Sequence, residues 1–451
     1  MWNGDGSRPE VCVGFVELSL PDRTDRTENI EKDMFKDDQA YARKLDKADP
    51  LKGFRTQFAL PKGQIYFTGN SLGLQPKNVR SYIDQELKDW AQLGVEGHFH
   101  AKRPWLYYHK FAKKSLARLV GAKPEEVVAM NQLTVNLHLM LTSFYRPTKT
   151  RFKIIAEAGA FSSDQYALES QIRLHGFDPD TALIEVAPRA GEYTLRSDDI
   201  INMIHQHGDT VALVLFGGVQ YYTGQFFPMS VIAKAAHEVG AYAGFDLAHA
   251  IGNVPLTLHA DNVDFAVWCS YKYLNSGPGG IAGAFIHEKH FDNKSIPRLA
   301  GWWGYNEANR FKMRKGFIPM AGVDAWQISN FPVLSGAAHL ASLEIFNKVN
   351  LQQFHKKRIS LTAYTRFILD QVDPEGKHFK IITPSFATDS GCQVSILVKS
   401  NGSSLFRKLT KAGVVADWRE PEVIRIAPVP LYNTFEEVWK FGQIVRKSLG
   451  I

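Results

Sequence analysis

FDLAHA at residues 245–250 and WCSYKYLN at residues 268–275 are the segments that decide the fold of this chain. Each closes an apolar run that we expect to be a strand, Ala241–Phe245 in the first case and Val263–Cys269 in the second. The first strand ends at a carboxylate, Asp246, and the second leads to an amine, Lys272. In an open α/β sheet, ligands bind just outside the carboxyl ends of the strands. The sequence therefore predicts that Asp246 and Lys272 share a ligand site.

This pair of residues has the chemistry that pyridoxal 5'-phosphate requires. The lysine forms a Schiff base with the aldehyde, and the aspartate keeps the pyridine nitrogen protonated, so that the ring withdraws electrons. Either residue alone is more often a buried structural Asp or a solvated Lys. The GPGG run at residues 277–280 and the aromatic neighbours of Lys272 favour a cofactor site, because a surface lysine needs neither.

Composition places the chain among ordinary globular proteins. It has 451 residues, 45% of them hydrophobic and 22% charged, which predicts two or three structural units with a large core. The formal net charge of +7 is modest for this length, and no Lys/Arg block dominates any segment. The charge therefore fits an anionic substrate or cofactor at least as well as nucleic acid.

Three widely spaced cysteines, Cys12, Cys269 and Cys392, form neither a disulfide framework nor a zinc ligand set. They favour a reducing compartment. No apolar run reaches the roughly 18 residues that span a bilayer, and the first residues lack the order of a secretory signal. We therefore expect a cytoplasmic protein.

Predicted strands and helices alternate along most of the chain, which indicates βαβ units and a mainly parallel sheet. An amphipathic helix at Glu31–Lys47, a short strand at Tyr66 and a helix at Val79–Leu93 come first. The alternating elements are helix Tyr108–Val120, strand Val127–Met130, helix Thr134–Phe144, strand Phe152–Ala156, helix Ser162–His175, strand Ala182–Val186, helix Ser197–His207, strand Val211–Phe216, helix Met229–Val239 and strand Ile281–Ile286.

The C-terminal part predicts a smaller α/β unit. Long helices are expected at Ala337–Asn350 and Gln352–Val372, followed by strands and helices at Phe379–Thr383, Gln393–Leu397, Ser404–Ala412, Ile424–Ala427 and Thr434–Ser448. We expect residues 1–75 to be an arm and a segment packing with the small domain, residues 76–340 the large cofactor-binding domain, and residues 341–451 the small domain.

Two strand-to-helix junctions are candidates for the phosphate and the ring of the cofactor. Thr134 is placed as a helix N-cap after a strand, where free N–H groups can bind phosphate. At the second junction, Phe161 could stack on the pyridine and Asp164 could reinforce positive charge at its nitrogen. A plain capped helix and a helix-start carboxylate are the alternatives.

Seven motifs in order along the chain resemble kynureninase. They are GNSLG at 69–73, KRPW at 102–105, LTVNLH at 133–138, YTGQ at 222–225, FDLAHA at 245–250, CSYKYLN at 269–275 and RIAPVPLYN at 425–433. The match runs from about residue 30 to the C-terminus. The lysine motif alone would indicate only a fold-type-I pyridoxal-phosphate enzyme, whereas the ordered set is far more specific.

The resemblance implies an aspartate aminotransferase-like fold, with a mainly parallel seven-stranded type of sheet and a smaller α/β C-terminal domain, in a homodimer. It implies hydrolysis of the Cβ–Cγ bond of L-kynurenine or 3-hydroxy-L-kynurenine, giving L-alanine and anthranilate or 3-hydroxyanthranilate. This reaction belongs to the kynurenine pathway of tryptophan catabolism and NAD biosynthesis. Membrane and nucleic-acid partners are not expected.

The same resemblance assigns cofactor contacts by position. Lys272 would carry the cofactor, and the residues around the phosphate would be Leu133, Thr134, Tyr271, Trp302 and Asn330, some of them reaching a second subunit. The residues around the ring would be Phe161, Ser162, Ser163, Asp164, Asp246 and His249. Gly217 stands where family members often have Ser, so a main-chain contact is expected there and a hydroxyl contact is in doubt.

Substrate contacts are expected at four further positions. Arg425, in an apolar strand, is the candidate for the substrate α-carboxylate, with a structural salt bridge as the alternative. Ser71 in the glycine-flanked turn, His98 and Asn330 are expected to contact the substrate. We expect the freed Lys272 amine to take the Cα proton, and Tyr222 or Tyr271 to act as acid or base at the carbonyl. No metal is expected, because His98 and His100 lack a third ligand at a fitting spacing.

Other functions remain open. Another fold-type-I enzyme, such as an aminotransferase or a cysteine desulfurase, would share the lysine and the aspartate. A desulfurase needs a nucleophilic cysteine on a mobile loop, and neither Cys269 nor Cys392 has that setting. A non-catalytic basic binding protein on this fold would have no need of the Lys–Asp pair, and the chain lacks the basic stripe of a nucleic-acid binder.

Overall fold

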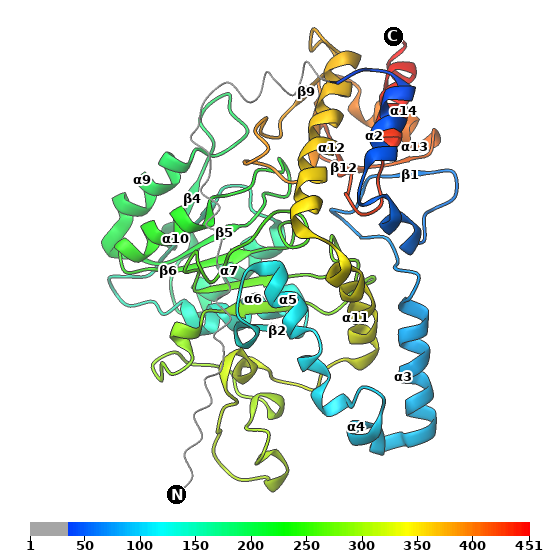
Figure 1. Ribbon diagram of the computed structural model, residues 1–451. Coiled ribbons are helices and arrows are strands. Elements are labelled where there is room, and N and C mark those ends of the chain that lie inside the picture. The colour runs from blue at the N-terminus through cyan, green and yellow to red at the C-terminus, as the bar shows by residue number, and fades with distance from the viewer. Residues whose placement is uncertain (1–34) are drawn as a thin grey trace, which may run out of the picture. The chain divides into compact units, whose positions relative to one another are not determined.

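A seven-stranded sheet lies at the centre of residues 35–451, the part of the chain that the computed structural model describes (Figure 1). Its strand order is β2-β8-β7-β6-β5-β3-β4, and only β8 runs antiparallel to its neighbours. The strands are β2 (Val127–Ala129), β3 (Lys153–Glu157), β4 (Leu183–Val186), β5 (Val211–Gly217), β6 (Tyr242–Asp246), β7 (Phe265–Trp268) and β8 (Gly283–Ile286). The predicted mainly parallel sheet is confirmed.

Helices cover both faces of this sheet, which is why its strands read as nearly continuous apolar runs. Within β5, Val214 and Phe216 belong to one core cluster and Leu213 and Leu215 to the other, since neighbouring side chains point to opposite faces. The first cluster includes residues of α5 (Lys113–Val120), α9 (Ser197–His207), α10 (Met229–Glu238) and α11 (Val333–Lys348). The second includes residues of α6 (Leu133–Phe144) and α7 (Ser162–Leu174).

A second, antiparallel sheet follows in the C-terminal part, with the order β12-β13-β10-β9. Its strands are β9 (Phe379–Ile381), β10 (Val394–Val398), β12 (Asp417–Arg419) and β13 (Val423–Ile426). The helices of this part are α12 (Leu351–Val372), α13 (Gly402–Lys411) and α14 (Phe435–Leu449). α14 begins with a capping box, in which Thr434 accepts from the Glu437 N–H.

The N-terminal described segment packs on this C-terminal part (Figure 1). In α2 (Gln39–Ala48), Asp46 accepts from the N–H groups of Phe435 and Glu436 at 2.7 and 3.0 Å. The short strand β1 (Ile65–Tyr66) pairs with β11 (Val414–Val415). These contacts support our proposal that residues up to about 75 belong with the small domain.

The boundary that we predict after residue 340 falls inside α11. The chain leaves this helix at its C-cap Val349 and enters α12 after the N-cap Asn350. α11 itself contributes Ala337 and Phe346 to the core of the large sheet. We therefore propose Val349–Asn350 as the point where the large domain ends.

Several local predictions differ from the structure. The predicted helix Tyr108–Val120 is a 3-10 helix at Trp105–Lys110 followed by α5. The predicted helix Glu31–Lys47 lies partly outside the described residues, and its described part begins at Gln39. α3 (Val79–Leu93) matches its prediction, whereas α4 (Gly97–His100) and α8 (Pro179–Ala182) were not predicted. None of the described helices combines the length and the apolarity that crossing a membrane requires.

Candidate active site

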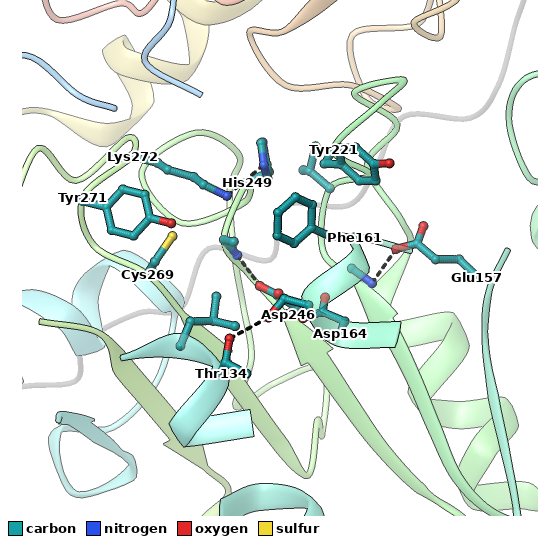
Figure 2. Close-up of a pocket in the computed structure, with 15 residues that line it drawn as sticks. Thr134, Glu157, Phe161, Asp164, Tyr221, Asp246, His249, Cys269, Tyr271 and Lys272 are labelled. Carbon is teal, nitrogen blue, oxygen red and sulfur yellow. Dashed lines mark hydrogen bonds between the residues drawn. The ribbon is translucent and has the colours of Figure 1, made fainter. Parts of the chain in front are cut away.

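Asp246 and Lys272 line one cavity at the carboxyl ends of the central strands, as the sequence predicts (Figure 2). Asp246 is the last residue of β6, and Lys272 follows β7 in the turn that starts at Cys269. β6 and β7 are parallel neighbours, with Asp246 opposite Val267. The sheet therefore brings together two groups that are 26 positions apart in the sequence.

The amine of Lys272 points into this cavity between three rings (Figure 2). Its Nζ lies 3.0 Å from Nε2 of His249, 5.8 Å from the centre of the Phe161 ring and 6.0 Å from that of Tyr271. Burial, reinforced by the positive charge of Lys272, holds the pKa of His249 well below its ordinary value. His249 is therefore a neutral imidazole beside the amine.

Two aspartates form a hydrogen-bonded pair at the other end of the cavity. Asp164 donates to Asp246, and Asp246 also accepts from the N–H of Ala248 at 2.6 Å. Burial and the nearby charge of Asp246 raise the pKa of Asp164 well above its ordinary value. The pKa of Asp246 is also raised by burial, but the Asp164 hydrogen bond and the Lys272 charge oppose this rise. The pKa of Asp164 is thus raised further than that of Asp246.

The N-termini of α6 and α7 meet at the same cavity. Thr134 Oγ1 lies 2.7 Å from Ser163 Oγ, and both residues stand in the first turn of their helices. The first N–H groups of a helix have no intrahelical acceptor and attract anions. Our prediction that Thr134 caps α6 is wrong, because the helix begins at Leu133 with Gln132 as N-cap. The side chain of Thr134 therefore does not cap the helix, and it lines the cavity.

Unsatisfied polar atoms in the cavity match the functional groups of pyridoxal phosphate. Among the described residues, Glu157 Oε2, Asp164 Oδ1 and His249 Nδ1 are buried without a hydrogen-bond partner. Buried polar atoms are nearly always paired, so such a concentration indicates a polar ligand. Helix N-termini suit the phosphate, Lys272 the aldehyde and Asp246 the ring nitrogen, and the residues therefore fit this cofactor.

Most of the predicted cofactor residues line the cavity. They are Leu133, Thr134, Phe161, Ser163, Asp164, Gly217, Asp246, His249, Tyr271 and Lys272. Ser162 is adjacent in sequence but does not line it, and neither do Trp302 and Asn330. Trp302 is 39% exposed and lies against Phe311, at 5.6 Å between ring centres, and Asn330 is also exposed.

None of the predicted substrate residues lines the cavity, and Arg425 and Ser71 lie beside it. Arg425 is buried, and its guanidinium bonds to Asp417 and to the main-chain oxygen of Tyr221, a residue that lines the cavity. Ser71 Oγ lies 3.4 Å from the same Asp417 carboxylate. Arg425 therefore forms a salt bridge in this structure while standing next to the cavity mouth. His98 lies elsewhere, where it contacts the carbonyl of Val95.

The sequence did not identify every residue that lines the cavity, and it left open which of two tyrosines transfers a proton. Glu157, Val219, Tyr221, Ala248 and Cys269 line the cavity without having been predicted as site residues. Glu157 ends the strand β3, a position of the same kind as Asp246, and this signal could have identified it. Of the two tyrosines considered for proton transfer, Tyr271 lines the cavity and Tyr222 does not.

The described cysteines are not nucleophiles of the kind that a desulfurase needs. Cys269 and Cys392 are both buried and free. Burial raises the pKa of the Cys269 thiol and raises that of Cys392 to about 12. A reactive cysteine requires a lowered pKa and access to solvent.

One group in the described residues has metal-ligating side chains at short range. Atoms of Glu126, His259 and His287 lie within 4.8 Å of one another. Glu126 precedes β2, and this places the group at the opposite end of the sheet from the cavity. The Glu126 carboxylate already accepts from the N–H groups of Lys123 and Glu288, both at 2.9 Å. Its hydrogen bonds are thus those of a structural carboxylate.

Solved structures share this fold, and one of them holds a PLP cofactor. A cysteine desulfurase from Thermococcus onnurineus aligns with a TM-score of 0.74 and 19% identity over 89% of this chain and 98% of its own. A mutant of C-DES with glycine covalently linked to its PLP cofactor aligns with a TM-score of 0.72 and 16% identity, over 87% of this chain and 98% of its own. At this identity, the likeness shows the fold alone.

Sequence comparisons define the family. The Aminotransferase class-V model matches residues 65–376, and the Kynureninase C-terminal domain model matches residues 354–445. The kynureninase of Flavobacterium psychrophilum is 53% identical over 92% of this chain and 99% of that protein. The kynureninase of Myxococcus xanthus is 51% identical over 90% of this chain and 96% of that protein. With these relatives and with a cavity that fits pyridoxal 5'-phosphate, the chain belongs to the kynureninase family.

Proposed function

We propose that this chain hydrolyses the Cβ–Cγ bond of L-kynurenine and 3-hydroxy-L-kynurenine, releasing L-alanine and anthranilate or 3-hydroxyanthranilate. The observation that carries this proposal is the single cavity that joins Lys272, the Asp164–Asp246 pair and two helix N-termini. The relatives named kynureninase, which cover about nine-tenths of the chain, narrow the chemistry to this reaction. When bound, pyridoxal 5'-phosphate supplies an aldehyde for the substrate amine and a ring that accepts electrons from Cα.

Lys272 and His249 supply the proton transfers at the amino-acid end. Once substrate has taken the place of the lysine, the free amine of Lys272 is positioned to remove the Cα proton. His249 is neutral and within 3.0 Å, so its imidazole keeps the amine oriented without adding a second positive charge. Asp246 would lie at the ring nitrogen of the bound cofactor and would keep that nitrogen protonated.

We propose Tyr271 rather than Tyr222 as the acid at the substrate carbonyl. Tyr271 lines the cavity on the same turn as Lys272, and burial raises the pKa of its phenol above the ordinary value. A phenol that stays protonated can donate to the carbonyl oxygen while water adds to the carbon. The collapse of that hydrated carbonyl breaks the Cβ–Cγ bond and gives the aryl acid.

Arg425 is our proposed partner for the substrate α-carboxylate. Its side chain is 1% exposed and lies over Tyr221, with 5.9 Å between the guanidinium carbon and the ring centre. One guanidinium nitrogen bonds to Asp417, whose carboxylate occupies the position that an arriving anion needs. Substrate binding would therefore exchange one carboxylate for another, with Ser71 beside them.

We also propose that the active unit is a homodimer. Phe99, Trp302 and Phe311 form an exposed aromatic patch, with Phe311 6.3 Å from Phe99 and 5.6 Å from Trp302 between ring centres. Exposed apolar groups of this kind mark protein interfaces. Trp302 and His98, which sit in or next to the patch and not in this chain's cavity, could then reach the cavity of a second copy.

A cytoplasmic location is proposed on the cysteine usage. Cys269 and Cys392 are free thiols buried in the described part of the chain. Such usage is typical of reducing compartments.

Side-by-side turnover of kynurenine and 3-hydroxykynurenine tests the proposed reaction. We expect L-alanine to appear in a one-to-one ratio with the aryl acid, and only when the cofactor is present. Formation of a keto acid without C–C cleavage would instead identify an aminotransferase. Release of sulfide from cysteine would identify a desulfurase.

A further inference from the structure

A third buried carboxyl group, Glu157, lies next to the aspartate pair and has no part in the reaction described above. Glu157, Gly217 and Asp246 are the last residues of β3, β5 and β6, which are neighbouring strands of the sheet. Gly217 is in register with Asp246. The three residues therefore form a row across the carboxyl ends of the strands, with the glycine between the two acids.

The Glu157 side chain is hydrogen-bonded to the main chain of Gly217. Its Oε1 accepts from the Gly217 N–H at 3.1 Å, while its Oε2 is buried without a partner among the described residues. A Cβ atom at position 217 would stand only 2.8 Å from Oε1. A side chain at position 217 would therefore require the Glu157 carboxyl group to shift.

Charge gives this arrangement a consequence for the cofactor. Burial, opposed by the Gly217 hydrogen bond and reinforced by the charge of Asp246, raises the pKa of Glu157 to about 8. The other titratable groups that face this end of the cavity are Asp164, Lys272 and the neutral His249. Near neutral pH a protonated Glu157 therefore adds no charge beside the aspartate pair, and its ionisation adds one negative charge.

We propose that Glu157 is a positioning residue of the cofactor site, which holds the end of β5 through Gly217 and sets, together with Asp246, the charge that the ring nitrogen faces. This inference rests on the proposed function, because it concerns the same cofactor. Glu157 acts through the main chain of Gly217 and through the field at Asp246. No contact between Glu157 and substrate is required.

The test compares the holoenzyme with its Glu157→Gln variant. The amide keeps the shape and the Gly217 hydrogen bond but cannot ionise. The readout is the visible absorbance of the bound cofactor as a function of pH, which changes when its linkage to Lys272 loses a proton. In the wild type, the negative charge of ionised Glu157 favours the protonated form of the linkage. We therefore expect the pH at the midpoint of the absorbance change to be lower in Glu157→Gln than in the wild type, by about one pH unit. The matched control is Glu185→Gln, an exposed glutamate on the adjacent strand β4, whose midpoint should equal that of the wild type.

Two further variants keep the proposal testable if Glu157→Gln folds poorly. Gly217→Ala crowds Oε1 of Glu157, so it should weaken cofactor binding and shift the same midpoint. Glu157→Asp keeps an ionisable group, so its midpoint should lie between those of the wild type and Glu157→Gln. An unchanged midpoint in both Glu157→Gln and Gly217→Ala would overturn the inference. The proposed function would survive that outcome as long as the wild type still releases alanine, and so the two failures are distinguishable.

Discussion

Nζ of Lys272 lies 3.0 Å from Nε2 of His249, and both side chains face the same cavity. The histidine comes from the segment after β6 and the lysine from the turn after β7, so their contact depends on the parallel pairing of these two strands. Because burial keeps the imidazole neutral, the contact is a hydrogen bond between an amine and a neutral ring. The reactivity of the lysine therefore rests on an uncharged neighbour.

Replacing Lys272 with Ala should abolish covalent attachment of the cofactor. Reduction with borohydride followed by mass spectrometry should add the cofactor mass to the wild type and not to Lys272→Ala. Alanine formation should fall by at least about 10³-fold, since the general base is lost together with the attachment. Lys234→Ala, at an exposed lysine of α10, is the control. Labelling of Lys272→Ala at full yield would place the attachment elsewhere.

Replacing Thr134 with Val should weaken cofactor binding by about 10-fold, the loss expected for one hydrogen bond to a charged group. The variant removes the hydroxyl that lies 2.7 Å from Ser163 Oγ at the two helix N-termini. The dissociation constant can be measured by titrating the apoprotein with cofactor. Thr142→Val on the same helix removes a hydroxyl that bonds to the His138 carbonyl, and it should leave the constant unchanged. Equal losses in both variants would point to a general effect on α6.

Replacing Arg425 with Lys should raise KM for kynurenine by about 10- to 100-fold, because an ammonium cannot bind the α-carboxylate in a bidentate manner. Cofactor absorbance should be retained. The comparison is Arg419→Lys, whose side chain is 37% exposed and also pairs with Asp417. If Arg425→Lys loses cofactor and substrate binding to the same extent, Arg425 supports the fold and not the substrate.

The aromatic patch predicts a concentration-dependent assembly. Phe311→Asp places a charge among exposed rings and should shift the sedimentation of the protein from dimer to monomer. Activity should fall with it if Trp302 or His98 completes the cavity of a second copy. Leu174→Asp introduces the same charge at another exposed apolar residue, which is 75% exposed, and should leave the assembly intact. A wild type that sediments as a monomer at all concentrations would contradict the proposed homodimer.

A buried histidine outside the site gives a pH dependence of stability with a defined sign. Burial alone lowers the pKa of His339 from 6.5 to about 4, so the unfolded chain binds the proton more tightly. The contribution of neutral His339 to the free energy of unfolding is complete above about pH 6.5 and is lost as the pH falls toward about 4. The melting temperature of His339→Phe should therefore decline less than that of the wild type over this interval. The same substitution at the exposed His205 provides the control. If the melting temperatures of His339→Phe and the wild type decline in parallel, the assignment is refuted.

The agreement between sequence and structure is closest where a single local rule applies. Apolar runs alternating with amphipathic segments were enough to predict the sheet, because burial on both faces leaves strands no polar positions. The helix α3 is also predicted at its observed bounds, Val79–Leu93. The segment around Trp105–Lys110 is different: its tight 3-10 turns place Leu106 and Tyr108 inside and resemble one helix in sequence.

The chain by itself determined that Asp246 comes at the end of one apolar strand and Lys272 just after another, because apolar periodicity and the rule on ligand sites at strand ends require no knowledge of distant contacts. Only the tertiary structure decided that Glu157 reaches across Gly217 into the same cavity and that Arg425 pairs with Asp417. It also decided that Trp302 and Asn330 face away from the cavity of their own chain. Strand order and register set these relationships, and they arise from pairings between residues far apart in sequence, for which no local pattern exists.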